Sequence, residues 1–372
     1  MRPIRIATVI GTRPEAIKLA PLILAAREHP DRFEVRIVRT GQHRELVDEL
    51  LTEFGLRADF DLKVMRPDQD LAHVLSASVR GLSDLIARER PDWVIVQGDT
   101  TTTLAGALAA FYNRARIGHV EAGLRTGDRR SPFPEEANRT LTTHLADLHF
   151  APTERARQNL LREGIDSAAI VVTGNTVVDA LVRTQGLAPL KRSGDSNGTA
   201  SPYFLVTTHR RENHGEALLR ICDAVRELLE LHPHTQAWIP MHPNPRVRAV
   251  LTHELGGNRR ALLTDPLSYT AFVRALEGAA LVLTDSGGVQ EECAALGKPV
   301  LVMREHTERP EAIEAGVAKV VGTGAHAIVD EASRLLRDAE SSTAAAARST
   351  NAFGDGRAAE RILAALRDQR SG

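Results

Sequence analysis

The chain has 372 residues, of which 42% are hydrophobic, 26% charged and only 4% aromatic. This length exceeds the size at which a single hydrophobic core stops growing, so about two domains are expected. The formal net charge of -1 argues against a general nucleic-acid-binding or membrane-surface role, because both normally need an excess of basic residues. No apolar run is long enough to span a bilayer. The two cysteines, Cys222 and Cys293, do not suggest a disulfide framework, and a cytoplasmic location fits best.

Short β-branched runs alternate with longer amphipathic segments along the whole chain, which predicts parallel sheets with crossover helices. In the first half the predicted strands are residues 4–10, 35–40, 93–97, 117–121, 148–151 and 170–173. In the second half they are residues 204–208, 237–241, 261–264, 281–284, 300–303 and 319–321. The predicted fold is therefore α/β, with two Rossmann-like doubly wound domains facing each other across a cleft.

The domain boundary is predicted from a break in this alternation. Residues 186–202 are rich in Gly, Ser, Pro and Asn and have no apolar period, as is typical of a linker. The N-terminal domain would then cover residues 1–185 and the C-terminal domain residues 203–355. A further amphipathic helix within residues 356–372 could pack back on the first domain or on the second. Ligands of such sheets bind beyond the carboxyl ends of strands, so the useful side chains should follow strands.

The first predicted strand is followed by residues 11–18, which read GTRPEAIK. Gly11 permits a tight turn and Pro14 suits the first turn of a helix. Arg13 and Lys18 would then lie at a helix N-terminus, which favours an anion. An ordinary turn with solvated charges would fit the same residues. The spacing is not that of a Walker loop, so ATP hydrolysis is disfavoured.

Carboxylates follow the next strands of the first half. Asp99 comes after the strand at residues 93–97, and Glu121 ends the strand at residues 117–121. Two carboxylates at neighbouring strand ends can split their pKa values, which makes proton donors and acceptors. Asp99 could instead only cap a helix. A further acidic pair, Glu135 and Glu136, follows a proline-bounded turn, and periodicity does not decide which of the two faces the ligand.

The second half carries features suited to a diphosphate. His209 and two arginines come directly after a strand, an arrangement that suits a diphosphate leaving group. Ser286, Gly287 and Gly288 lie between a strand and a helix, where the backbone can approach phosphate closely. Glu292 lies one helical turn further on, where it could reach ribose hydroxyls. The segment 304–311 (REHTERPE) adds cations at a proline-started helix, and no metal-binding spacing appears.

These motifs, in this order, resemble the non-hydrolysing UDP-N-acetylglucosamine 2-epimerases, a family with the glycosyltransferase-B architecture. The resemblance runs over nearly the whole chain and rests on GTRPEAIKLAP, GDTTTT, HVEAGLRTGD, PFPEEANR, HRREN, LTDSGGVQEE, LGKPVLVMR and TERPEA. It implies reversible conversion of UDP-GlcNAc to UDP-ManNAc through an enzyme-bound 2-acetamidoglucal, without a cofactor. It also implies a cytoplasmic homodimer that supplies ManNAc to bacterial surface polysaccharides.

The resemblance also implies roles for individual residues. Asp99, Glu121 and Glu135 match the acids assigned to proton transfer, and His209 matches the histidine near the diphosphate. Phe272 matches the aromatic residue beside the uracil. The remaining matches are nucleotide-diphosphate contacts, namely Arg13, Lys18, Ser286, Gly287, Gly288, Glu292 and Arg309. The division of acid and base between the three carboxylates is a hypothesis.

Three other functions are compatible with parts of this pattern. A glycosyltransferase of the same architecture would share the phosphate site but would need an acceptor pocket. A hydrolysing epimerase would release free ManNAc and UDP, because water would enter during the glycal stage. A regulator that binds a nucleotide sugar would show no turnover. Three acids together with His209 favour proton chemistry at the sugar.

Overall fold

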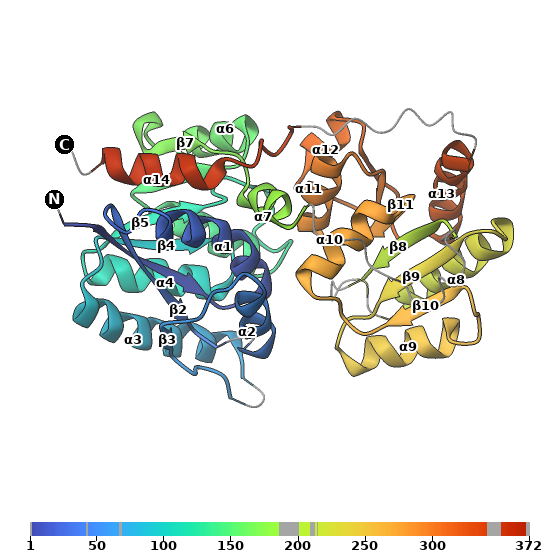
Figure 1. Ribbon diagram of the computed structural model, residues 1–372, viewed down its shortest axis with the longest axis horizontal. Coiled ribbons are helices and arrows are strands. Elements are labelled where there is room, and N and C mark those ends of the chain that lie inside the picture. Colours follow the sequence, from blue (N-terminus) through green and yellow to red (C-terminus); the bar gives the residue numbers. More distant parts are fainter. Residues whose placement is uncertain are drawn as a thin grey trace. The chain divides into compact units, whose positions relative to one another are not determined.

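The structure is a computed structural model that describes residues 2–41, 44–66, 69–185, 201–208, 213, 215–340 and 351–369. The chain divides into two compact units, Met1–Arg183 with Gly354–Gly372, and Thr184–Phe353 (Figure 1). Most of the predicted linker, residues 186–200, lies outside the described residues, and so does His209.

The first unit is built on a parallel sheet with strand order β3-β2-β1-β4-β5-β6-β7 across the described residues. Its strands are β1 (Ile4–Ile10), β2 (Phe33–Arg39), β3 (Phe60–Asp61), β4 (Trp93–Gln97), β5 (Arg116–Val120), β6 (Leu148–Ala151) and β7 (Ile170–Val172). Its helices are α1 (Arg13–Arg27), α2 (Arg44–Glu53), α3 (Leu71–Glu89), α4 (Thr101–Tyr112), α5 (Glu135–Thr143), α6 (Glu154–Arg162), α7 (Thr176–Thr184) and α14 (Ala358–Asp368). The order of strands reverses between β1 and β4, which makes their carboxyl ends the switch point of the sheet.

The second unit repeats this plan with strand order β10-β9-β8-β11-β12-β13 in the residues described. Its strands are β8 (Tyr203–Thr207), β9 (Gln236–Pro240), β10 (Ala261–Thr264), β11 (Leu281–Thr284), β12 (Val300–Val302) and β13 (Ala318–Val320). Its helices are α8 (Glu216–Leu231), α9 (Pro245–Leu255), α10 (Tyr269–Gly278), α11 (Gly287–Leu296), α12 (Pro310–Glu314) and α13 (Ala325–Glu340). The switch point here lies between β8 and β11.

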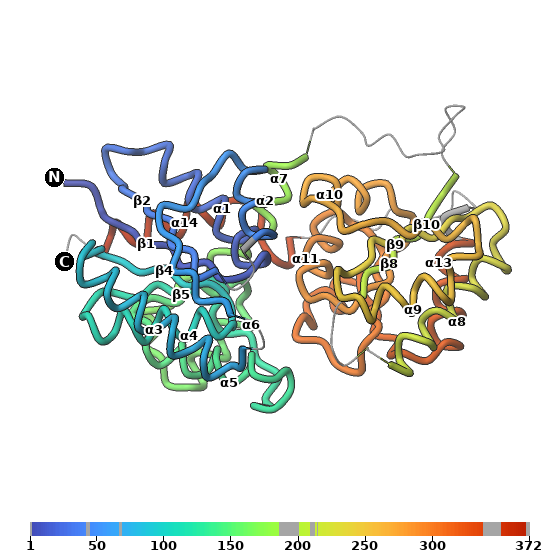
Figure 2. The backbone as a smooth tube through the Cα atoms, turned by 90° about the horizontal axis from the view of Figure 1, so that it is seen from below, coloured from blue at the N-terminus to red at the C-terminus, as the bar shows by residue number. Residues whose placement is uncertain are grey.

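Both sheets are covered by helices on their two faces, which explains why the strands are nearly continuous apolar runs. In the first unit α1 and α14 lie on one face and α3 and α4 on the other (Figures 1 and 2). Alternate side chains of β1, such as Ala7 and Val9, pack with Leu82 and Leu85 of α3. In the second unit α8, α9 and α13 cover one face, where their apolar side chains form one cluster with the strands.

The C-terminal helix α14 belongs to the first unit, a question that the sequence left open. It packs beside α1, as the red and blue helices of Figure 1 show. Its first backbone N–H groups, at Ala358 and Ala359, donate to the buried carboxylate of Asp179 on α7 over 3.2 and 2.8 Å. A carboxylate at a helix N-terminus satisfies unpaired donors and complements the helix dipole.

The predicted strands are confirmed within the described residues, each to within two residues at either end. The structure adds β3, a strand of two residues that is too short to carry a hydrophobic period. None of the described helices combines the length and the apolar character needed to cross a membrane.

Candidate active site

The predicted polar residues of the first unit lie at one edge of its sheet. Strands β1, β4 and β5 are neighbours and all parallel. Arg13 and Lys18 are on α1 after β1, Asp99 follows β4, and Glu121 follows β5. Because the carboxyl ends of parallel strands share one edge, these side chains gather at the switch point.

Lys18 and Glu121 form a buried ion pair at this edge. Lys18 Nζ lies 2.5 Å from Glu121 Oε2, and the two side chains are only 8% and 5% exposed. The amide of Gln97, the last residue of β4, donates to the same oxygen. The positive charge of Lys18 stabilises an ionised Glu121 in this dry environment.

The strand predicted at residues 117–121 ends one residue early, at Val120. Glu121 has φ of 65°, a left-handed conformation that is rare for residues other than glycine. Such a conformation cannot continue a β ladder. Its cost, on the order of 1–2 kcal/mol, is typical of residues whose side chain must take one particular direction.

Helix α5 is joined to the loop that carries Asp99. Arg139 Nη2 lies 2.5 Å from Asp99 Oδ2, and Asn138 Nδ2 donates to the Asp99 backbone carbonyl over 3.0 Å. Glu135 is the first residue of α5 and precedes Arg139 by four positions, so both occupy the same face of the helix. The third predicted acid is therefore on the helix face that meets Asp99.

The structure distinguishes Glu135 from its neighbour Glu136. Glu136 Oε1 accepts from the backbone N–H groups of Thr126 and Gly127, both over 3.0 Å, and Oε2 lies 3.3 Å from Arg139 Nη1. The Oε2 atoms of both glutamates are buried and accept no hydrogen bond from the described residues, but only that of Glu136 lies beside a guanidinium. A buried carboxylate oxygen without a donor is costly unless a ligand supplies the donor. Glu136 therefore braces a loop, and Glu135 is the stronger candidate for chemistry.

His119 supports the loop before Asp99 from within β5. Its ring is fully buried, and its Nε2 lies 2.7 Å from the carbonyl of Gly98. Burial lowers the pKa of His119 to about 3, so the ring is neutral and Nε2–H is the donor. Gly98 has φ of 71°, which turns the chain towards Asp99.

In the second unit, a cation lies over a helix N-terminus at the switch point. Helix α11 begins at Gly287, directly after β11 and Ser286, so its first backbone N–H groups have no partner within the helix. A Cβ atom on Gly287 would come within 3.0 Å of Arg309 Cζ, so the guanidinium lies directly against this turn. A helix N-terminus and an arginine that converge in this way form an anion site.

Arg309 is held in place by buried carboxylates. Its Nε donates to Glu291 Oε1 over 2.8 Å, and its Nη1 lies 3.6 Å from Glu308 Oε2. Glu308 also pairs with Arg304 over 3.0 Å. All four side chains are at most 8% exposed. Buried charges in such a chain are stable only as a complete set, which gives the guanidinium one position.

Three other predicted residues lie in the same parts of the two units. Glu292 is buried on α11, Phe272 is half-buried on α10, and Arg13 is half-buried as the first residue of α1. The described residues contain no group of three or more His, Cys, Asp or Glu side chains that could ligate a metal ion.

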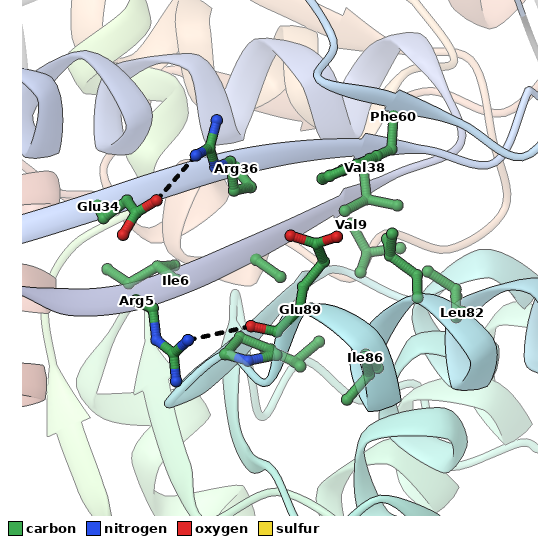
Figure 3. Close-up of a pocket in the computed structure, with 14 residues that line it drawn as sticks. Arg5, Ile6, Val9, Glu34, Arg36, Val38, Phe60, Leu82, Ile86 and Glu89 are labelled. Carbon is green, nitrogen blue, oxygen red and sulfur yellow. Dashed lines mark hydrogen bonds and ion pairs between the residues drawn. The ribbon is translucent and has the colours of Figure 1, made fainter.

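A pocket of about 130 Å³ lies elsewhere in the first unit, between the sheet and α3 (Figure 3). Its floor includes Val9 and Val38, and Leu82 covers it. Arg5 and Glu34 line it from the amino-terminal ends of β1 and β2. Because the candidate site uses the carboxyl ends of the strands, this pocket is a separate feature of the sheet.

Several residues of the site were not predicted from the sequence. The most direct contacts come from Gln97 and Arg139, which hold Glu121 and Asp99. Arg139 could have been found, because it lies four residues after Glu135 on a predicted helix. Gln97 could not, because an apolar strand ending in an amide is a common pattern.

Both units are doubly wound. The first carries carboxylates at its switch point and the second carries an anion site at its own. This combination defines a two-domain Rossmann-like enzyme of the glycosyltransferase-B type. The chain belongs to the UDP-N-acetylglucosamine 2-epimerase family, whose sequence model matches residues 25–367. The predicted α/β fold with two Rossmann-like doubly wound domains and the predicted family are thereby confirmed, and the chain is an isomerase.

Relatives share nearly the whole chain. The UDP-N-acetylglucosamine 2-epimerase of Escherichia coli K12 is 49% identical over 377 residues, which cover 98% of this chain and 99% of the relative. A crystal structure of UDP-GlcNAc 2-epimerase from Neisseria meningitidis bound to UDP-GlcNAc is 41% identical, with a TM-score of 0.90 and coverage of 98% and 99%. The Methanocaldococcus jannaschii UDP-GlcNAc 2-epimerase in complex with UDP-GlcNAc and UDP is 33% identical, with a TM-score of 0.85 and coverage of 99% and 100%.

Proposed function

We propose that the protein interconverts UDP-GlcNAc and UDP-ManNAc by eliminating UDP to form 2-acetamidoglucal and then adding UDP back. The observation that carries this proposal is the set of carboxylates held at the switch point of the first unit, in a chain 41% identical to an epimerase with UDP-GlcNAc bound. Such a set suits removal and return of a proton at carbon.

The proposed reaction needs a base, an acid and a site that retains UDP. A carboxylate takes the C2 proton, and the C–H electron pair becomes the C1–C2 double bond. The C1–O bond breaks, and its electron pair leaves with the β-phosphate oxygen of UDP. An acid then delivers a proton to the opposite face of C2, and the phosphate oxygen bonds to C1 again. Atoms balance without a cofactor.

We assign the proton transfers to Asp99, Glu121 and Glu135. The ion pair with Lys18 makes Glu121 suited to the role of base, and the unpartnered, buried oxygen of Glu135 is suited to contact with the sugar. The division of the roles between the three carboxylates remains part of the proposal.

We assign UDP binding chiefly to the second unit. Arg309 and the first turn of α11 would neutralise the diphosphate, which also keeps UDP in place after the C1 bond breaks. The other proposed contacts are His209, Arg13, Lys18, Phe272, Ser286, Gly287, Gly288 and Glu292.

Incubation with UDP-GlcNAc in D₂O, followed by NMR, tests the proposal against its rivals. Epimerisation by elimination gives UDP-ManNAc with deuterium at C2. A hydrolysing enzyme would give free ManNAc and UDP, a glycosyltransferase would give no C2 exchange and would require an acceptor, and a regulator would give no change. Any of these three results contradicts the proposal.

The carboxylate roles are tested by Asp99→Asn, Glu121→Gln and Glu135→Gln. Each general acid or base contributes typically ~10²–10⁴-fold to rate, so each variant should slow C2 exchange by at least about 100-fold. Wild-type exchange in all three variants would overturn the assignment while leaving the epimerase function intact.

The proposal includes a biological setting. We propose a cytoplasmic homodimer that supplies ManNAc units for surface polysaccharide. The buried, unbridged Cys222 and Cys293 are consistent with a reducing compartment. Phe111 and Tyr112 on α4 are 57% and 66% exposed, which suits a contact between subunits. Light scattering on the purified protein tests the dimer, and a monomer at micromolar concentration would contradict it.

A further inference from the structure

Glu15 is a fully buried carboxylate in the first turn of α1 to which neither the sequence motifs nor the proposed reaction gives a role. Its side chain is turned back to the start of the helix, where Oε2 accepts from Gly11 N over 2.7 Å and from Thr12 N over 2.6 Å. The hydroxyl of Thr12 adds a third donor over 3.1 Å. This half of the carboxylate holds the loop after β1.

The other half of the carboxylate reaches a different loop. Glu15 Oε1 accepts from the hydroxyl of Thr100 and lies 3.1 Å from Thr103 Oγ1. Both threonines are at the start of α4, directly after Asp99. One side chain therefore connects the loop after β1 with the loop after β4, across the switch point of the sheet.

The two loops are also packed against each other without spare room. A Cβ atom on Gly11 would overlap the side chain of Thr102, so only glycine fits there. Thr102 Oγ1 in turn lies 3.2 Å from Thr40 Oγ1, beyond the end of β2. Small shifts in the Glu15 contacts would therefore move the ends of neighbouring strands together.

The same contacts lead to the Lys18–Glu121 pair. Lys18 follows Glu15 by three residues on α1. Gln97 also donates to Glu121. The backbone carbonyl of Gln97 in turn accepts from the Thr103 hydroxyl over 2.6 Å. The chain of contacts from Glu15 through α1, Lys18, Glu121, Gln97 and Thr103 returns to Glu15. It closes a ring around the ends of β1, β4 and β5, the last two of which are followed by the proposed proton-transfer groups Asp99 and Glu121.

We propose that Glu15 is a positioning residue that sets the place of Lys18 and Glu121 relative to Asp99 by tying the loop after β1 to the loop after β4. The inference rests on the proposed epimerase function. A helix cap alone needs only Oε2 and would work at the surface. Burial of the whole carboxyl group is unfavourable and raises the pKa of Glu15. Because capping does not require this burial, the contacts of Oε1 with the start of α4 have a use beyond capping.

The test uses Glu15→Asp and Thr100→Val, which break the connection from opposite sides. Aspartate is shorter by one methylene, about 1.5 Å, and cannot reach both loops. Misplacement of reacting groups by about 1 Å costs on the order of 10²-fold. We expect kcat for epimerisation to fall 10-fold or more in each variant. The Kd for UDP, measured by calorimetry, should change less than about 3-fold, because most proposed UDP contacts lie in the second unit.

Thr100→Ser is the matched control, because it keeps both the hydroxyl that donates to Glu15 and the cap of α4, where Thr100 accepts from Thr103 N over 3.1 Å. It should retain most of the kcat. The double variant should be no slower than the slower single variant, because both changes break one connection. Folding is monitored by circular dichroism, and if Glu15→Asp does not fold, the Thr100 pair still decides.

The outcomes separate the inference from the function on which it rests. If the wild-type chain produces no deuterated UDP-ManNAc, the proposed function is wrong. If the wild type epimerises and Thr100→Val keeps its kcat, or loses it only in proportion to the unfolded fraction, Glu15 is merely structural and the inference is overturned.

Discussion

The ammonium group of Lys18 lies 2.5 Å from Glu121 Oε2, and both side chains are almost completely buried. Removal of one member leaves an uncompensated charge in a dry site, which costs about 3–5 kcal/mol. We therefore expect Lys18→Met to lower the free energy of unfolding by about that amount, as measured by urea denaturation. It should also reduce C2 exchange, because Glu121 loses the cation that stabilises its ionised form.

The double variant Lys18→Met with Glu121→Gln provides the control for this prediction. With no charge left to compensate, it should be more stable than the sum of the two single losses implies, by about 1–3 kcal/mol. Losses that simply add would contradict a direct interaction between the two side chains.

Glu135 and Glu136 are adjacent in sequence but should respond oppositely to the same change. Glu136→Gln weakens the contacts to the backbone of Thr126 and Gly127 and to Arg139, so we expect a loss of about 2–3 kcal/mol in the free energy of unfolding. Glu135→Gln removes no hydrogen bond at Oε2, so stability should stay within about 1 kcal/mol of wild type. Its kcat should nevertheless fall at least about 100-fold.

Each of these variants is the control for the other. Thermal unfolding and NMR turnover are measured on both under the same conditions. Equal losses of kcat would contradict the distinction between the two glutamates. A greater stability loss in Glu135→Gln would show that they have been assigned the wrong way round.

The strands were predictable because a parallel sheet with helices on both faces leaves continuous apolar runs in the sequence. The ends of the strands were harder to predict. Glu121 was expected inside a strand, whereas its φ of 65° places it after the strand. Nothing in the composition of residues 117–121 marks that conformation, and the partners of the Glu121 side chain, Lys18 and Gln97, lie outside this segment.

The candidate site was predictable only in part, for a similar reason. Some charged side chains could be found by position, such as Asp99 after a strand and Arg309 before a proline-started helix. Their partners lie far away in sequence, such as Glu291 for Arg309 and Arg139 for Asp99. The pairing of distant residues comes from the topology of the sheet, which local periodicity does not encode.

Gly287 keeps the Arg309 guanidinium close to the first turn of α11. An added methyl group would come within 3.0 Å of Arg309 Cζ and would have to displace it. We expect Gly287→Ala to weaken UDP binding about 10-fold, equivalent to about 1.4 kcal/mol, as measured by calorimetry. Gly257→Ala is the control, because a Cβ atom there would meet nothing within 4 Å. Unchanged affinity in Gly287→Ala would contradict the placement of UDP at this turn.

Two buried histidines should make the protein sensitive to mild acid. Burial lowers the pKa of His119 to about 3 and that of His149 to about 4, from an ordinary value of 6.5. The unfolded chain therefore binds protons that the folded protein excludes. The contribution of the two neutral histidines to the free energy of unfolding is complete above pH 6.5 and is lost as the pH falls below that value. Between pH 7.5 and 5.5 each histidine should cost about 1.4 kcal/mol, or about 3 kcal/mol together.

Urea denaturation at the two pH values measures this loss. His119→Gln keeps a donor that can reach the Gly98 carbonyl but does not titrate, so the loss attributable to the pair should fall by about half, to about 1.4 kcal/mol. If His119→Gln lost as much stability as wild type between the two pH values, His119 would titrate alike in the folded and unfolded chains. Burial would then not be what keeps the ring neutral as a donor to the Gly98 carbonyl.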